Sequence, residues 1–270
     1  MVEDRPGIVE SMESGGVLRI TIDRPEVGNS LSPLARDTLA AALERAHSAP
    51  EIRAVLLGAT GVRHFCAGAG LGSSASNAQP AQRKPGDIAR MLQQGWQRLV
   101  AAILDCDKPV VAAVNGTAAG AGASLVLAAD LVVMSDDARL VEPFVHRGIL
   151  PDSGAIHLLT RIVGLRRASE ILMLGDPLDA ADCHSLGLVN RLVAPDALGD
   201  TALELAKRLA AGPTVMLSLT KRLLSVSSES SRDRAFEQEA WAQEVVSGTE
   251  DLQEGLRAFA ERRDAEFKGF

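Results

Sequence analysis

The stretch KPVVAAVNGTAAGAGASLVLAADLVVMSDDARLVEPFVHRGIL, residues 108–150, decides the fold. Its apolar run at residues 110–114 is short and does not alternate with polar residues, which is typical of a buried strand. A glycine-rich turn at residues 115–122 follows, and an apolar segment from Ala123 toward Asp130 predicts a helix. A strand, a turn of small residues and a helix bring bare backbone N–H groups and a helix N-terminus together. The stretch therefore predicts a place that accepts negative charge.

The glycine-rich turn does not match the common nucleotide-binding motifs. A dinucleotide fingerprint would need a third glycine where Leu125 stands, and the Gly-Lys-Ser/Thr of a P-loop is missing. Close packing of a strand on a helix is the structural alternative. A second turn of small residues, Cys-Ala-Gly-Ala, occupies residues 66–69. Two such turns can each direct one backbone N–H at a single oxygen atom, as in an oxyanion hole.

The composition excludes several classes of function. The chain of 270 residues is 46% hydrophobic, carries a net charge of −7, and has 3% aromatic residues with no tyrosine. These values argue against nucleic acid, which needs a basic surface and stacking rings. No run of about eighteen apolar residues predicts a membrane span. We expect no secretory signal in the acidic first ten residues, and no metal site. Three scattered cysteines predict reduced thiols in a cytoplasmic protein.

The order of elements predicts an α/β protein. Strands at residues 17–23, 54–59 and 131–134 alternate with helical patterns, which indicates ββα or βαβ repeats. Residues 72–86 are low in complexity and predict a mobile loop beside a site. From about residue 155 onward the patterns are mostly helical.

Three segments in this order resemble the crotonase superfamily of enoyl-CoA hydratases and isomerases. They are FCAGAGL at residues 65–71, the opening stretch, and GILPDSGAIHLLTRIVGLRRASEILMLGDPLDAADCHSLGLVNRLV at residues 148–193. The resemblance implies a crotonase-like spiral of ββα units with an acyl-CoA site in residues 1–195. It implies a C-terminal helical trimerisation region in residues 196–270, and a homo-oligomer that is a trimer or a dimer of trimers. It implies no cofactor beyond the coenzyme A moiety of the substrate.

The resemblance also assigns binding residues. The enolate oxygen of the thioester would accept hydrogen bonds from the N–H groups of Ala69 and Ala121, the latter in place of the family's usual glycine. Arg24 and Lys268 would contact the phosphates of coenzyme A. The adenine side would lie against backbone of Ala67, Gly68, Ala69 and Leu71.

The two glutamates of the family's hydratases are absent. Their positions correspond to Ser124 and Phe144, neither of which can act as a carboxylic acid or base. Glu142 lies two residues before the second position and is a weaker candidate, the alternative being a solvated or salt-bridged side chain. A hydratase mechanism with two carboxylates is therefore disfavoured.

One carboxylate stands where isomerase-like members need it. Residues 148–154, GILPDSG, resemble their PD-x-G segment, in which a single aspartate moves a proton between carbons of the acyl chain; here it is Asp152. The alternative is an N-cap of the helix that begins near Gly154. His146 is a further candidate for proton chemistry, and its alternative is a surface role.

These residues predict an acyl-CoA enzyme that stabilises a thioester enolate, with isomerase-type proton transfer favoured over hydration. The competing hypothesis is a non-catalytic acyl-CoA binding protein of the same fold.

Overall fold

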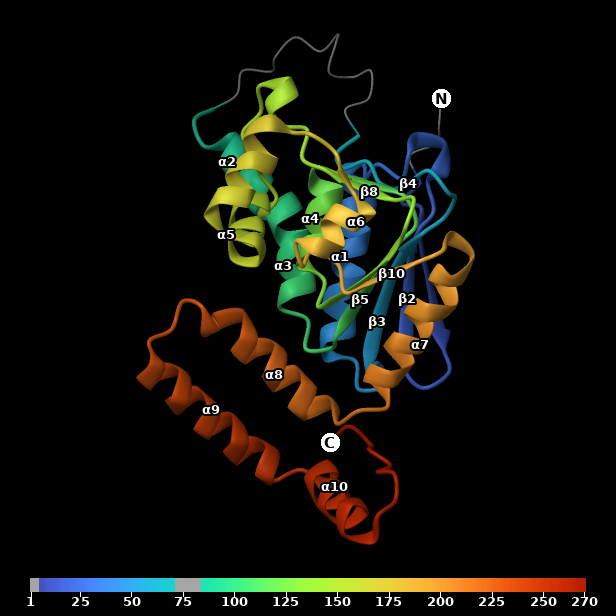
Figure 1. Ribbon diagram of the computed structural model, residues 1–270, viewed down its shortest axis with the longest axis vertical. Helices are drawn as coiled ribbons and strands as arrows, with labels where there is room; N and C mark the ends of the chain where they lie inside the picture. The colour runs from blue at the N-terminus through green and yellow to red at the C-terminus, as the bar shows by residue number, and fades with distance from the viewer. Residues whose placement is uncertain (1–4, 71–83) are drawn as a thin grey trace.

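The computed structural model describes residues 5–70 and 84–270. Most of the predicted loop at residues 72–86, and Leu71, lie outside these ranges. The described residues form two sheets and a set of helices (Figure 1). No helix among them is long and apolar enough to cross a membrane.

The larger sheet is parallel except at one edge, where β1 pairs antiparallel with β2. Its strands, in spatial order, are β1 (Ile8–Glu13), β2 (Val17–Ile22), β3 (Ala54–Ala59), β5 (Val110–Val114), β7 (Leu131–Ser135) and β10 (Arg191–Val193).

The smaller sheet is built from very short strands. Its order is β4 (His64–Cys66), β6 (Thr117–Ala119), β8 (Arg139–Val141) and β9 (Leu178–Asp179), and the first three are parallel.

The chain repeats a unit of two strands and a helix. Of the two predicted repeats, ββα and βαβ, the structure has ββα. In three units the first strand joins the larger sheet and the second joins the smaller one. The helices are α1 (Pro33–Ser48), α2 (Asp87–Leu92), α3 (Arg98–Leu104), α4 (Ala121–Ala128), α5 (Ala155–Leu174), α6 (Ala180–Ser185), α7 (Leu198–Ala210), α8 (Thr214–Ser227), α9 (Arg232–Ser247) and α10 (Glu250–Glu261), with shorter turns η1 (Pro25–Val27), η3 (Gln93–Gln97), η4 (Val145–Arg147) and η5 (Pro195–Ala197).

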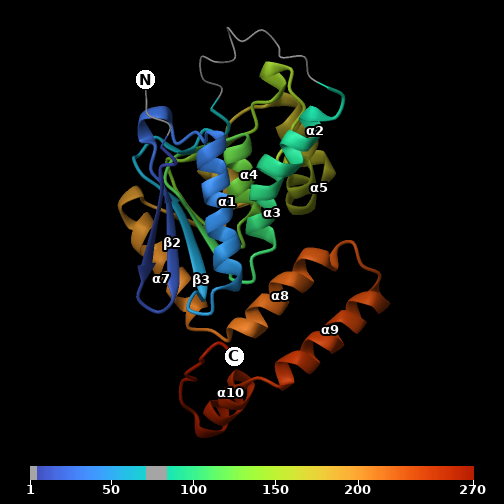
Figure 2. The same cartoon turned by 180° about the vertical axis from the view of Figure 1, so that it is seen from behind.

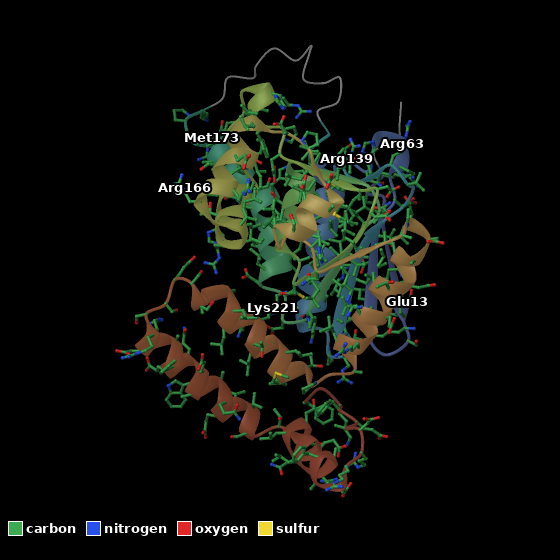
Figure 3. The ribbon with its side chains drawn as sticks, viewed as in Figure 1. Glu13, Arg63, Arg139, Arg166, Met173 and Lys221 are labelled. Atoms are coloured by element: carbon green, nitrogen blue, oxygen red, sulfur yellow. The ribbon has the colours of Figure 1, made fainter. Side chains whose placement is uncertain are left out.

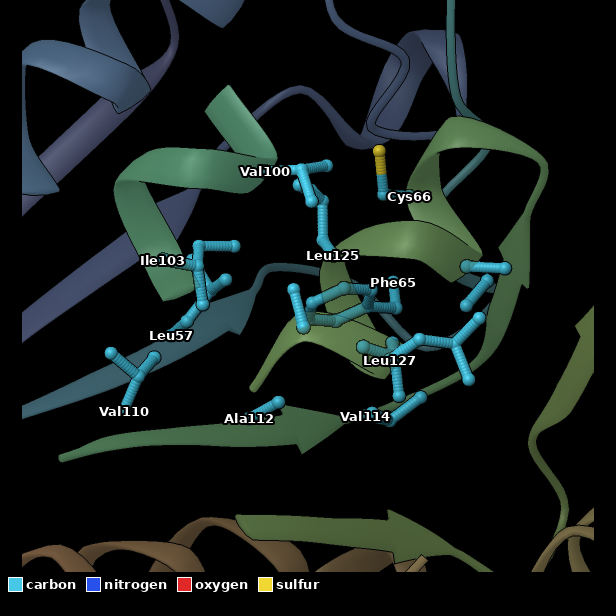
Figure 4. Packing of buried hydrophobic residues seen from close by; sticks show 14 of the residues in the cluster. Leu57, Phe65, Cys66, Val100, Ile103, Val110, Ala112, Val114, Leu125 and Leu127 are labelled. Atoms are coloured by element: carbon cyan, nitrogen blue, oxygen red, sulfur yellow. The ribbon is translucent and has the colours of Figure 1, made fainter. Parts of the chain in front are cut away.

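Strand β5 is buried on both faces, which explains why its sequence is continuously apolar. Val110, Ala112 and Val114 belong to the larger core cluster, which also contains residues of α1, α3 and α4 (Figures 2 and 4). Val111 and Ala113 face the other way and pack with residues of α7. The predicted C-terminal region, residues 196–270, thus begins with a helix that covers the sheet.

The remaining C-terminal helices stand away from the core. Helices α8 and α9 form a hairpin, and α10 follows it (Figure 1). Thr214 is the one buried residue of α8, and α9 has none.

Helix α5 is broken in its middle at Gly164, where φ is 76° and ψ is 165°. A side chain would meet nothing within 4 Å there, so glycine is required by its backbone angles alone. The first half carries the buried Leu158 and Leu159, whereas Leu165 and Met173 in the second half are about 70% exposed.

Lys221 attaches α8 to the core (Figure 3). Its side chain is 9% exposed, and its Nζ lies 2.7 Å from Asp130 Oδ2. It also donates to the carbonyl oxygens of Ile103 at 2.8 Å and Lys108 at 3.4 Å. The same Asp130 oxygen accepts the N–H of Val110 at 2.8 Å, so one carboxylate joins the helix to the first residue of β5.

We expect Lys221→Met to lower the free energy of unfolding by about 1.5–3 kcal/mol, the usual effect of losing hydrogen bonds to a charged group. Lys207→Met, at an exposed lysine of α7, is the control and should change little. Urea titration of both variants measures the difference. Equal midpoints for the two variants would contradict this role.

Candidate active site

Three turns that follow parallel strands meet at one edge of the smaller sheet. Residues 67–69 follow β4, Gly120 follows β6, and Glu142 follows β8. The carboxyl ends of parallel strands share an edge, and ligands of open α/β sheets commonly bind there. The ββα repeat therefore brings together the two predicted small-residue turns and a third segment.

The first two turns pack backbone against backbone. A Cβ on Gly68 would lie 2.7 Å from the carbonyl oxygen of Ala119 and 3.4 Å from the nitrogen of Ala121. A Cβ on Gly122 would lie 2.1 Å from the carbonyl oxygen of Cys66. Only glycine permits this approach.

Neither predicted donor amide has a backbone acceptor among the described residues. Leu31 N–H donates to Gly68 at 2.9 Å, and Gly70 N–H donates to Leu31 at 3.4 Å. This pairing leaves the N–H of Ala69 without a backbone acceptor among the described residues. Ala121 is the first residue of α4, where the N–H has no partner within the helix. The positive end of α4 therefore lies beside a second bare N–H.

Asp152 does not cap α5, so the capping alternative is wrong. The N-cap is Gly154, with φ of 85°, and no side chain caps the helix. Asp152 is half-buried, and its Oδ1 accepts a hydrogen bond from Ser153 Oγ at 2.8 Å. Ser153 is fully buried at φ of 54°, a left-handed conformation that is uncommon for serine. Such backbone conformations are concentrated at functional sites.

Glu142 is neither solvated nor salt-bridged, which corrects the alternative considered for it. Its exposure is 0%, and neither carboxyl oxygen has a hydrogen-bond partner among the described residues. Burial raises the pKa of Glu142 well above its usual value, and the negative charge of Asp152 raises this pKa further. Glu142 is therefore harder to ionise than an exposed glutamate.

The two positions that correspond to hydratase glutamates hold no acid. Ser124 is fully buried in α4, and its Oγ has no partner among the described residues. The ring of Phe144 lies 3.6 Å from where a Cβ on Gly120 would be. Phe144 therefore packs against the turn between β6 and α4.

His146 packs beside Gly175, which also approaches the backbone of Glu142. His146 is exposed, and its Nε2 lies 3.2 Å from the carbonyl oxygen of Gly175, beyond the far end of α5.

The two predicted phosphate-binding residues lie at opposite ends of the larger sheet. Arg24 follows the carboxyl end of β2, is 6% exposed, and has no partner for Nε or Nη1 among the described residues. Arg53, just before β3, donates to the carbonyl oxygen of Phe267, next to Lys268, at 2.9 Å. Since β2 and β3 run parallel and six residues of strand span about 20 Å, one chain does not bring Arg24 and Lys268 together.

Among residues 5–70 and 84–270, no group of three or more His, Cys, Asp or Glu side chains is arranged to hold a metal ion.

We expect Gly122→Ala to destabilise the fold by about 1–3 kcal/mol or more, because the new methyl group would overlap the Cys66 carbonyl. Gly199→Ala is a matched control, since that helical glycine has nothing within 4 Å. Its free energy of unfolding should stay unchanged or rise by up to about 1 kcal/mol. Thermal unfolding of both variants gives the comparison, and similar destabilisation by both would refute the close approach.

The raised pKa of Glu142 predicts a pH-dependent stability. Below the pKa that Glu142 has in the unfolded chain, its carboxyl group is neutral in both the folded and the unfolded state. Above that pKa, Glu142 ionises in the unfolded chain first. The contribution of Glu142 to the free energy of unfolding therefore falls as pH rises. Glu142→Gln should therefore gain stability relative to the unsubstituted chain from about pH 4 toward neutral pH, by at most about 1.4 kcal/mol per pH unit. Urea titrations across this range measure the trend. Parallel profiles would show that Glu142 ionises equally in both states.

Comparison with known proteins places this geometry in a family. The family model described as enoyl-CoA hydratase/isomerase matches residues 12–269. The chain is 35% identical over 254 residues to the 1,2-epoxyphenylacetyl-CoA isomerase of Escherichia coli K12, covering 94% of this chain and 95% of the relative. It is 34% identical to a probable enoyl-CoA hydratase of Rhodobacter capsulatus, covering 95% of this chain and 96% of the relative.

Solved structures agree with this match. A putative enoyl-CoA hydratase from Streptomyces coelicolor A3(2) superposes with a TM-score of 0.90 at 32% identity, covering 100% of this chain and 96% of that one. An enoyl-CoA hydratase from Bacillus anthracis gives a TM-score of 0.90 at 28% identity, covering 98% of this chain and 100% of that one. The expected crotonase fold is confirmed, and the chain belongs to the enoyl-CoA hydratase/isomerase family.

Proposed function

We propose that this protein isomerises the double bond of an acyl-CoA thioester through an enolate, rather than adding water across it. The observation that carries this proposal is the state of Asp152. It is a half-buried side chain that has no capping role in α5, whereas Ser124 and Phe144 occupy the hydratase positions.

The proposed oxyanion hole uses the two bare amides. The N–H groups of Ala69 and Ala121 donate to the thioester oxygen, on which negative charge develops when the enolate forms. They need no rearrangement, because the backbone contacts of Gly68 and Gly122 fix both turns. Losing one such donor typically lowers kcat by about 10²–10³.

Asp152 carries the proton in this proposal. Its carboxylate removes a proton from Cα of a 3-enoyl thioester, and the electron pair of that C–H bond moves into the thioester carbonyl. The enolate is conjugated with the double bond, so negative charge also develops at Cγ. Asp152 returns the proton to Cγ, which yields the 2-enoyl thioester. Asp152 ends ionised, and no other reactant is consumed.

Hydration fits these residues less well. Adding water needs one group to activate the water and another to protonate carbon, and neither the Ser124 hydroxyl nor the Phe144 ring does this at neutral pH. The E. coli relative is named for isomerising an epoxide of a CoA thioester, which supports isomerisation of a CoA thioester as the class of reaction.

For the coenzyme A moiety we propose Arg24 with Ala67, Gly68, Ala69 and Leu71, of which Leu71 lies outside the described residues. Lys268, at the other end of the sheet, would serve a coenzyme A held by another copy. This assigns residues 1–195 to the site. Within residues 196–270, α7 covers the sheet of its own chain, and the helices that follow it serve assembly of a trimer or dimer of trimers in the cytoplasm. Exposed apolar side chains on the C-terminal helices support assembly: Leu224, Phe236, Trp241, Val245, Leu256 and Phe259.

Asp152→Asn tests the proton transfer. We expect turnover of 3-enoyl thioesters to 2-enoyl thioesters to fall by about 10²–10⁴, with binding retained, because an amide cannot take the proton. Asp176→Asn, at an exposed aspartate just beyond α5, is the control and should keep full activity. Spectrophotometric assays with both thioesters measure the rates.

Other outcomes would select other functions. If the unsubstituted protein binds both thioesters and turns over neither, it is a non-catalytic acyl-CoA binding protein. If it hydrates 2-enoyl thioesters, the isomerase proposal is wrong. Full activity of Asp152→Asn would transfer the proton chemistry to Glu142 or His146.

A further inference from the structure

Asp152 and the three residues after it form a tight turn into α5. The N–H of Ala155, the first residue of α5, donates to the carbonyl oxygen of Asp152 at 3.0 Å. The two residues between them both have positive φ, 54° at Ser153 and 85° at Gly154. Positive φ at both central residues is the mark of a type I′ β-turn. The backbone of Asp152 is therefore fixed relative to the start of the helix.

Serine is an unusual residue for the first central position of this turn. Type I′ turns prefer Asn, Asp or Gly there, because the Cβ of a left-handed residue comes too close to the following carbonyl oxygen. Gly154 meets the preference at the second central position, whereas Ser153 departs from it at the first. A residue held in such a conformation at a candidate site points to a role for its side chain.

The hydroxyl of Ser153 is bonded to the carboxylate of Asp152. Its Oγ donates to Asp152 Oδ1 at 2.8 Å, and hydrogen bonds to an ionised acceptor are stronger than those between neutral groups. Ser153 is 0% exposed, whereas Asp152 is half-buried. No backbone N–H and no other side chain of the described residues donates to this carboxylate. The donor therefore lies in the interior, and the acceptor is partly open.

The buried start of α5 keeps Ser153 in place. Ala155 is 0% exposed, Leu158 and Leu159 belong to the larger core cluster, and the N–H of Leu158 donates to the carbonyl oxygen of Gly154 at 2.9 Å. The turn is thus continuous with a part of the helix that is packed in the core. A half-buried aspartate alone can change between side-chain rotamers. The serine hydroxyl joins this movable carboxylate to a fixed part of the fold.

We propose that Ser153 is a positioning residue for Asp152: its buried hydroxyl holds Oδ1 of the carboxylate and leaves Oδ2 to take the proton of the acyl group. This inference rests on the proposed function of Asp152 as the proton carrier. Ser153 acts through Asp152 and does not touch the substrate, consistent with its complete burial.

Two substitutions separate the hydroxyl from the backbone conformation. Ser153→Ala and Ser153→Gly both remove the hydroxyl, but only glycine adopts positive φ at no steric cost. Both should lower kcat for 3-enoyl isomerisation by about 3- to 10-fold at unchanged KM, because the freed carboxylate spends time in unproductive rotamers. Ser169→Ala removes a hydroxyl that donates to Leu165 within α5, and this control should keep full activity.

Stability distinguishes positioning from a purely structural role. Ser153→Gly should have a higher Tm than Ser153→Ala, because it relieves the left-handed strain, yet the two variants should lose kcat equally. If Ser153 served only the fold, activity would follow Tm and Ser153→Gly would be the more active variant. In the Asp152→Asn background, Ser153→Gly should cause no further loss, because the two residues act as one unit.

Several results would overturn the inference. They are an unsubstituted kcat in Ser153→Gly, a loss that appears in KM and not in kcat, or an additive loss in the double variant. If Ser153→Ala does not fold, Ser153→Gly decides alone, since glycine is a favoured residue at this position of the turn.

The failure of the broader proposal looks different. No turnover by the unsubstituted protein, or full activity of Asp152→Asn, removes the isomerase function whatever the variants of Ser153 do. An inactive Asp152→Asn beside a fully active Ser153→Gly removes the positioning role alone.

Discussion

The close contact between the start of α4 and the end of β4 is the constraint on which the site depends. With the Cys66 carbonyl against Gly122 and the Ala119 carbonyl against Gly68, two turns from separate repeats become one rigid unit. These contacts involve backbone atoms and glycines, so other side chains around them can vary while the two turns stay in place. This explains how a family with one fold supports relatives named as isomerase, hydratase and dehydratase.

Much of the fold could be predicted because its signals are strong and local. The apolar run at residues 110–114 forms the buried strand β5, as predicted. The prediction of a turn over residues 115–122 was wrong at β6, and that of a turn over residues 66–69 was wrong at Cys66 of β4, because three-residue strands show no periodicity. Their pairing depends on the ββα repeat, which is a property of the whole chain.

The candidate site was only partly predictable. Small residues in the two turns indicate a close backbone approach, which the structure shows at Gly68 and Gly122. The choice of Ala69 and Ala121 as donors came from the family resemblance and stays a prediction. The complete burial of Glu142 could not be predicted, because it is set by packing around the end of β8 and not by spacing along the chain. The one available signal was an acidic residue directly after a strand of a parallel sheet. The separation of Lys268 from Arg24 likewise follows from the path of the C-terminal tail past Arg53.

The break at Gly164 has a consequence for how α5 packs. Both halves of the helix reach the core, with Leu158 and Leu159 buried before the break and Ala168 and Ile171 buried after it. Glycine has few backbone restrictions, so the chain can change direction between these two pairs. One long element therefore covers the core along two directions, and Leu165 and Met173 are left exposed on the second half.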